Sequence, residues 1–297
     1  MVPPLESVRE SLVRFRTADD GIDTTTLPEP RRAVMKLARI ATDDGPVAGR
    51  YEDGVLHADD GAYDVGVDPD FLSPCDPSAL YRIDGDLAAT DDQSTRERVD
   101  AFDFVAEPPA PLVGHRTPVP APDVADELVA GKLVAVGELA AVIDERCRNV
   151  SEDEVPDVVR GYTIRNDLVA VDSNGHTARD AFDGSGSLGP WIETAVDPIG
   201  VGMRFDVSGE RRREATVESL PFAPAEIVSS LSRRVTLRSG DVVSLGSPAA
   251  PGSVEAGGAV ETTYEGVGTL RNAVVDADGE RGRERANEGK RRGVGLH

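Results

Sequence analysis

The sequence predicts an α+β protein that is rich in β-strands, and three observations support this fold class. Between residues 102 and 275, short apolar segments alternate with turn-forming Gly, Asp and Pro, which is the pattern of strands joined by turns. Only two stretches have helical features, one starting at Ser151 and one over 223–237. A polar segment at 88–101 follows a strand-rich segment at 35–87, so we expect a small N-terminal domain, a linker and a larger domain at 102–276.

The two ends of the chain are predicted to lie outside these domains. Residues 1–34 are polar, contain many turn formers and have no sustained hydrophobic period, which indicates an N-terminal extension. Met35 opens the first strand-like segment and is a candidate start of translation. Residues 277–297 are charged and rich in Gly, so we expect a disordered tail.

The elements of the larger domain have identifiable signals. Ser151 and Glu154 have the spacing of a capping box, and Pro156 limits that helix to a short one. The second helix has an apolar face, formed by Ile227, Leu231 and Val235. Strands are then expected at "DVVSLGSP", "AVETTYEGV" and "GTLRNAVV", because each is bounded by Gly or Pro.

The charge of the chain limits its partners. The formal net charge is -22, from 54 acidic and 32 basic residues, and only three of the basic residues are lysine. An acidic surface repels phosphate backbones and anionic lipids, so we expect neither nucleic acid nor a membrane as partner. Abundant Asp and Glu with arginine in place of lysine indicate a halophilic protein, since concentrated salt screens the self-repulsion. The alternative is an ordinary acidic protein of a mesophile.

The sequence also indicates a cytoplasmic protein without structural disulfides. There is no run of 18 or more apolar residues, and the N-terminus is charged where a signal peptide would be apolar. The two cysteines, Cys75 and Cys147, are too few for a disulfide framework or a four-cysteine zinc site. We therefore expect both to be unreactive thiols.

One acidic residue stands in an apolar segment. In "KLVAVGELAAVIDE", residues 132–145, Glu138 is surrounded by aliphatic residues typical of a buried strand. A carboxylate removed from water is costly unless it is paired, protonated or bound to a metal ion. Glu138 therefore requires a partner from elsewhere in the chain.

Several sequence blocks together resemble one enzyme family. The blocks "GELAAVIDE", "GYTIRNDLVAVD", "SGSLGPWIETAVDPIG", "LSRRVTLRSGDVVSLGSPA" and "YEGVGTLRN" occur in the order and spacing of the fumarylacetoacetate hydrolase (FAH) family catalytic domain. The resemblance covers 102–276, and 35–87 resemble the small N-terminal domain more weakly. It implies a mixed β-roll or β-sandwich, a homodimer, and a small 2-oxo or 1,3-diketo acid as substrate.

The resemblance also implies a divalent cation, Mg²⁺, Mn²⁺ or Ca²⁺, which would stabilise an enolate as a Lewis acid. Two of the family's carboxylate ligands match Glu138 and Asp167, and the third falls on Val136, which cannot bind a metal ion. Ser247 matches the threonine of a family turn, and its hydroxyl is expected to contact the substrate or the backbone.

Other positions depart from the family pattern. Asp180 stands where the family has a lysine that stabilises an oxyanion, and Val171 stands where relatives have an arginine. The His and Glu of the family's lid have no counterpart between 88 and 104. Catalytic residues cannot be assigned on this pattern. Two functions therefore remain open: hydrolysis, decarboxylation or isomerisation of a small oxo acid, or a non-catalytic relative that binds a ligand or a partner subunit.

Further polar residues are candidate site residues with weaker support from the sequence. Asp180 and Asp183 are candidates to replace the missing carboxylate, with a solvated loop as the alternative. His176 lies between Asp167 and Asp180 and is the better candidate for a base or ligand, whereas His115 is expected to be a loop residue.

Overall fold

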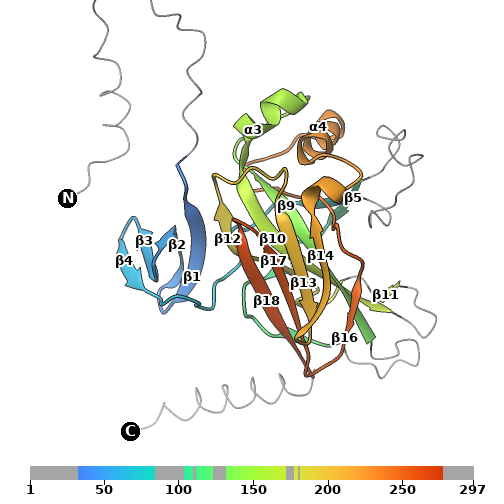
Figure 1. Ribbon diagram of the computed structural model, residues 1–297. Coiled ribbons are helices and arrows are strands. Elements are labelled where there is room, and N and C mark those ends of the chain that lie inside the picture. The colour runs from blue at the N-terminus through green and yellow to red at the C-terminus, as the bar shows by residue number, and fades with distance from the viewer. Residues whose placement is uncertain are drawn as a thin grey trace, which may run out of the picture. The chain divides into compact units, whose positions relative to one another are not determined.

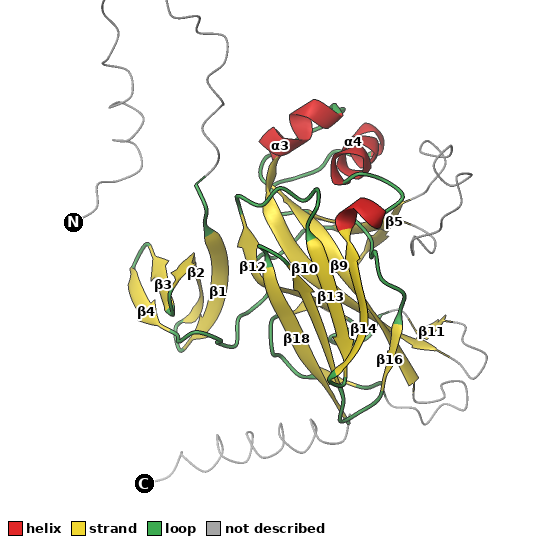
Figure 2. Cartoon of the chain, in the orientation of Figure 1, coloured by secondary structure: helices red, strands yellow, loops and turns green. Residues whose placement is uncertain are grey.

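The computed structural model describes residues 33–83, 104–109, 112–122, 132–171, 177–179 and 181–276, with only the backbone for Lys132 and 177–179. The predicted linker, the predicted tail and nearly all of the predicted N-terminal extension lie outside these residues. Two β-sheets dominate the described part, and its few helices lie at one end of them (Figures 1 and 2). The predicted strand-rich α+β fold is therefore confirmed. None of the described helices is long and apolar enough to cross a membrane.

The first four strands form an antiparallel meander of β1 (Lys36–Thr42), β2 (Gly45–Glu52), β3 (Val55–Ala58) and β4 (Gly61–Asp64). Asp53 and Gly54, which join β2 to β3, have φ values of 48° and 88°. A two-residue hairpin loop of this kind needs positive φ at both positions, which Asp-Gly adopts readily. β1 also pairs with β12 (Gly186–Glu193), so the meander extends the large sheet.

An aromatic cluster packs the meander against β12. The ring of Trp191 stacks on Tyr51 with centroids 5.5 Å apart. Phe71 meets Tyr51 and Trp191 edge-on, at 5.1 Å and 6.0 Å. Trp191 therefore serves packing between the meander and β12, while the predicted boundary between two domains stays a prediction.

The large sheet is built around two long central strands. It has 13 strands, with the main order β4-β3-β2-β1-β12-β10-β9-β15-β5-β6. β9 (Lys132–Ile143) and β10 (Val159–Val171) are its longest strands and pair antiparallel along nearly their whole length. The shorter members are β5 (Leu80–Ile83), β6 (Phe104–Glu107), β7 (Leu112–Val113), β11 (Thr177–Arg179), β15 (Val242–Ser244) and β16 (Gly252–Val254).

This sheet curls on itself. β6 and β10 are four strand spacings apart in the order, which is about 19 Å in a flat sheet. Yet the side chains of Glu107 on β6 and Arg165 on β10 are in contact at 2.5 Å. The sheet must therefore bend until β6 faces β10, as the expected β-roll requires.

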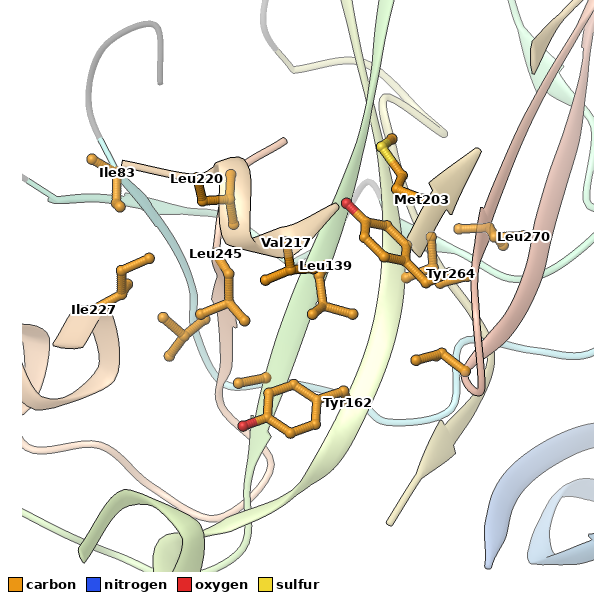
Figure 3. Close-up of a cluster of buried hydrophobic side chains, with 14 of the residues drawn as sticks. Ile83, Leu139, Tyr162, Met203, Val217, Leu220, Ile227, Leu245, Tyr264 and Leu270 are labelled. Carbon is orange, nitrogen blue, oxygen red and sulfur yellow. The ribbon is translucent and has the colours of Figure 1, made fainter. Parts of the chain in front are cut away.

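A second sheet covers the face of β9 and β10 that is turned away from β6. Its order is β14 (Glu210–Thr216), β13 (Gly202–Val207), β17 (Ala259–Tyr264), β18 (Gly268–Val275) and β8 (Val119–Pro120). Apolar side chains of both sheets form the main core, and Figure 3 shows Leu139 of β9 with Tyr264 and Leu270 of the second sheet. β17 and β18 occupy the two segments predicted as the last strands.

The predicted helices are present with small differences in length. The carboxylate of Glu154 accepts a hydrogen bond from the backbone N–H of Ser151 at 2.9 Å, which confirms the capping box. The helix after it is short, as predicted: η1 (Glu152–Glu154) is followed by α3 (Val155–Val158). α4 (Pro224–Arg234) ends before the predicted 237, because Val235 is already extended and leads into a bridge between Leu237 and Cys147. A further short helix is η2 (Val217–Ser219).

A buried polar network joins the two sheets. Asn166 on β10 donates to Asn272 Oδ1 on β18 at 3.2 Å and accepts from Thr262 Oγ1 on β17 at 2.6 Å. Asn272 Oδ1 also accepts from Ser187 Oγ at 2.7 Å, and its Nδ2 donates to two backbone carbonyls at 2.9 and 3.0 Å. The side chain of Asn272 thus satisfies several buried groups that would otherwise have no partner.

Replacing Asn272 by Ala should lower the free energy of unfolding by about 2–4 kcal/mol, because the substitution leaves several of these buried groups unpaired. Urea denaturation measures the change. Arg271→Ala, the neighbouring exposed position on β18, should cost less than about 1 kcal/mol. Equal losses in the two variants would contradict a structural role for the network.

Candidate functional site

Strands β9 and β10 place the predicted site residues. In their antiparallel pairing, Glu138 lies opposite Arg165 and Val136 lies opposite Asp167. Side chains alternate between the faces of a strand, so these four residues share one face. Gly137 faces the other way, since a Cβ there would overlap a side chain of β17. The site face is therefore the face turned away from the five-stranded sheet.

The guanidinium of Arg165 is the centre of this face. Its Nη1 donates to Glu138 Oε2 at 2.7 Å, and its Nη2 donates to Asp167 Oδ1 at 2.8 Å. Nη2 also donates to Glu107 Oε2 at 2.5 Å. Arg165 is 1% exposed, so water screens these ion pairs little. Three strands thus each bring one carboxylate to the same buried cation.

Further donors complete the cluster. Glu138 Oε2 also accepts a hydrogen bond from Ser244 Oγ on β15 at 2.8 Å. The other oxygen of Glu107 accepts from Arg82 Nε on β5. Glu138 is 9% exposed, and the partner that its position requires is Arg165. Pairing with a guanidinium is one of the arrangements in which a buried carboxylate is tolerated.

The carboxylates raise the pKa of Arg165. Burial alone disfavours its charged form, but attraction by Asp167, Glu138 and Glu107 outweighs burial. Arg165 therefore stays protonated over the whole accessible pH range. Arg82, which pairs with Glu107, is a second cation in contact with the described cluster.

A pocket of about 160 Å³ lies beside the cluster. Arg82, Arg165, Glu107 and Asp167 form its polar wall, and small or apolar residues form most of the rest. The Nε of Arg165 is buried and has no hydrogen-bond partner among the described residues. Pockets for drug-sized ligands measure about 300–1,000 Å³, so this one suits a smaller molecule.

The cluster has the donor chemistry of a hard-cation site, but its arrangement does not fit one. Carboxylate oxygens are the ligands that Mg²⁺ and Mn²⁺ prefer. Here one oxygen of each carboxylate already accepts from Arg165, whose positive charge repels a second cation. Within the described ranges, no group of three or more His, Cys, Asp or Glu side chains is placed to hold a metal ion. Glu138 and Asp167 lie close together, as a shared metal ion would require. The group between them is the guanidinium of Arg165, and their binding of a metal ion stays a prediction.

The other predicted site residues lie outside this cluster. Ser247 Oγ accepts from the N–H of Ala249 and donates to its carbonyl, both at 3.1 Å, in a local turn. It does not line the pocket, and its contact with substrate stays a prediction. Asp180 and His176 lie outside the described residues. Asp183 is exposed and is not part of the pocket wall.

Arg165 and Glu107 are the site residues that sequence reasoning missed. Arg165 precedes the Asn-Asp pair in "RNDL", and the two-residue period of a strand places it on the face of Asp167. That signal was available. Glu107 had no comparable signal, because it lies on a four-residue strand 58 positions before Arg165 in the sequence.

His115 is a buried structural residue in a turn, which agrees with its expected position in a loop. Its Nδ1 accepts the backbone N–H of Arg271 at 3.2 Å, so the other ring nitrogen carries the proton and donates to Asp68 Oδ1 at 3.0 Å. Burial lowers the pKa of His115, while Asp68 partly opposes this. His115 does not line the pocket beside Arg165.

Replacing Arg165 by Met should lower the free energy of unfolding at neutral pH by about 3–5 kcal/mol, because it leaves buried carboxylates without their cation. Chemical denaturation at neutral pH measures this loss. The matched control is Arg211→Met on β14, where the arginine is exposed and its ion pairs contribute about 1 kcal/mol or less. An Arg165→Met protein as stable as the wild type would contradict the pairing.

The lowered pKa of His115 predicts a stability change in mild acid. The unfolded chain takes up a proton near the ordinary pKa of 6.5, before the folded protein does. The contribution of His115 is therefore fully present above about pH 6.5 and is lost as the pH falls below it. Unfolding free energies measured across this range should show the decline, and His115→Gln should remove part of it. An unchanged slope in the variant would contradict the assignment.

Comparison with known proteins identifies the family. The model of the fumarylacetoacetate (FAA) hydrolase C-terminal family matches residues 85–275. An uncharacterised protein of Archaeoglobus fulgidus is 31% identical over 248 residues, which cover 82% of this chain and 97% of that protein. Three further relatives are matched over 61–64% of their own length.

Solved structures of two enzymes have a similar fold. The 5-carboxymethyl-2-hydroxymuconate delta-isomerase of Mycobacterium smegmatis is 28% identical with a TM-score of 0.68, over 82% of this chain and 100% of that one. The maleylpyruvate hydrolase of Sphingobium, in complex with manganese(II) and pyruvate, is 27% identical with a TM-score of 0.59, over 69% and 74%. Because the family model spans well over half of the sequence, this chain belongs to the fumarylacetoacetate hydrolase family.

Proposed function

We propose that this protein is an enzyme that converts a small 2-oxo or 1,3-diketo acid in the pocket beside Arg165. The observation that carries the proposal is the pocket wall, in which two guanidinium groups and two carboxylates surround a space of about 160 Å³. Relatives of this fold include an isomerase and a hydrolase, and one was solved with pyruvate. The substrate class is therefore a small carboxylic acid with a neighbouring carbonyl group.

The polar wall supports chemistry through an enolate. The side chain of Arg82 on the pocket wall is 26% exposed, and its guanidinium can pair with a carboxylate or carbonyl oxygen of the substrate. A fixed donor aimed at a developing oxyanion lowers the barrier to enolate formation. Asp167 lies on the same wall and is the candidate for accepting the proton from carbon. Hydrolysis, decarboxylation and isomerisation of such acids can all use this intermediate.

A non-catalytic, ligand-binding relative is the second candidate, and the ion pairing favours it. Glu107, Glu138 and Asp167 all accept hydrogen bonds from Arg165, so one oxygen of each is already engaged in an ion pair. Asp180 stands where the family resemblance implies a lysine, and Val136 stands where it implies a carboxylate. Such a protein would bind the acid without converting it.

Three further properties stay predictions: a homodimer, a cytoplasmic location and adaptation to concentrated salt. Light scattering measures the mass of the oligomer. Thermal unfolding in dilute buffer and in molar potassium chloride tests the adaptation to salt, since only a halophilic protein should be much more stable in the salt. Activity should be measured in both media for the same reason.

The wild type should convert oxaloacetate and acylpyruvates faster than they react in buffer without enzyme. Enol absorbance and release of pyruvate follow the conversion. Asp167→Asn should lower kcat on the order of a hundredfold or more for the isomerisation of oxaloacetate or the hydrolysis of an acylpyruvate, because both reactions need a proton acceptor. Glu255→Gln, an exposed carboxylate on the loop after β16, should leave kcat unchanged. A wild type that is stabilised by these acids but converts none of them would instead support the binding protein.

A further inference from the structure

Arg165 takes the place in which a cation would be expected. Carboxylates from β6, β9 and β10 surround the guanidinium group of Arg165, whose terminal nitrogens contact them at 2.5, 2.7 and 2.8 Å. The planar fork of arginine can serve several carboxylates at once, whereas a lysine ammonium is a single point charge. The centre of the carboxylate cluster is therefore already occupied by a cationic side chain of the protein itself.

The surrounding positions are consistent with a resident guanidinium and not with a metal ion. Val136 lies directly opposite Asp167 on the site face, so the position best placed to add an oxygen ligand has none. Arg165 comes from the middle of β10, which pairs with β9 and β12 on either side, so its backbone cannot move away. Its side chain is buried and would have to leave three ion pairs to make room.

We propose that the guanidinium of Arg165 is the built-in cation of this site and replaces the divalent metal ion that the family resemblance implies. The wild-type site then binds no Mg²⁺ or Mn²⁺. Charge balance comes from the protein itself, so assembly of the site is independent of metal supply. The proposal concerns how the carboxylates are neutralised and holds whether or not the pocket converts a substrate.

Titration of the full-length wild type with Mn²⁺ tests the proposal directly. Electron paramagnetic resonance reports the free ion, and molar potassium chloride suppresses loose binding to the acidic surface. The expected result is no saturable binding beyond that of Asp167→Asn, and no change in Tm after treatment with a chelator. Saturable binding of one Mn²⁺ per chain that Asp167→Asn abolishes would overturn the proposal. The exposed control Glu255→Gln should behave as the wild type.

A gain of metal binding gives the second measurement. The double variant Val136→Glu with Arg165→Met removes the guanidinium and adds a carboxylate opposite Asp167. It should bind one Mn²⁺ per chain at least about tenfold more tightly than the wild type, with a higher Tm in the presence of the ion. Arg165→Lys, which keeps the positive charge, should gain nothing. A folded double variant without Mn²⁺ binding would overturn the proposal, and if the variant does not fold, the wild-type titration decides.

Discussion

The contact between Arg165 and three carboxylates is the interaction on which the site depends. Each partner is tolerated only because the others are present: Glu138 is buried beside aliphatic residues, and Arg165 is buried more completely still. Desolvation of these charges is costly, and short hydrogen bonds from a planar guanidinium offset it. The cluster is therefore a cooperative unit, in which removal of one member changes the electrostatics of all the others.

The geometry of this unit follows from the shape of the large sheet. Pairing of β9 with β10 sets Glu138 opposite Arg165, and the two-residue period adds Asp167 to the same face. The curl of the sheet then brings β6 and Glu107 over that face. A flat sheet would leave Arg165 with two partners and no pocket, so the roll creates both the third ion pair and the space for a ligand.

Neighbouring residues of one short motif lie on opposite faces of β10 and have different roles. In "RNDL", Arg165 and Asp167 face the pocket, whereas Asn166 faces the second sheet and bonds to Asn272 and Thr262. The asparagines thus fasten the two sheets together, and this holds the strand that carries the charged residues. Packing stability and site chemistry are encoded in alternate residues of the same strand.

Local pattern and motif order were enough to predict the strand-rich fold class, the capping box at Ser151 and the family. They also predicted three of the four strands after residue 240, but not β16. Glu138 and Asp167 could be singled out for the same reason. The partner of Glu138 was decided by tertiary structure. Strand register selects Arg165 from the 29 arginines of the chain, and sheet curvature recruits Glu107 from 58 positions away. Neither register nor curvature is a property of any local segment, since both arise only when distant strands pair and the sheet closes on itself.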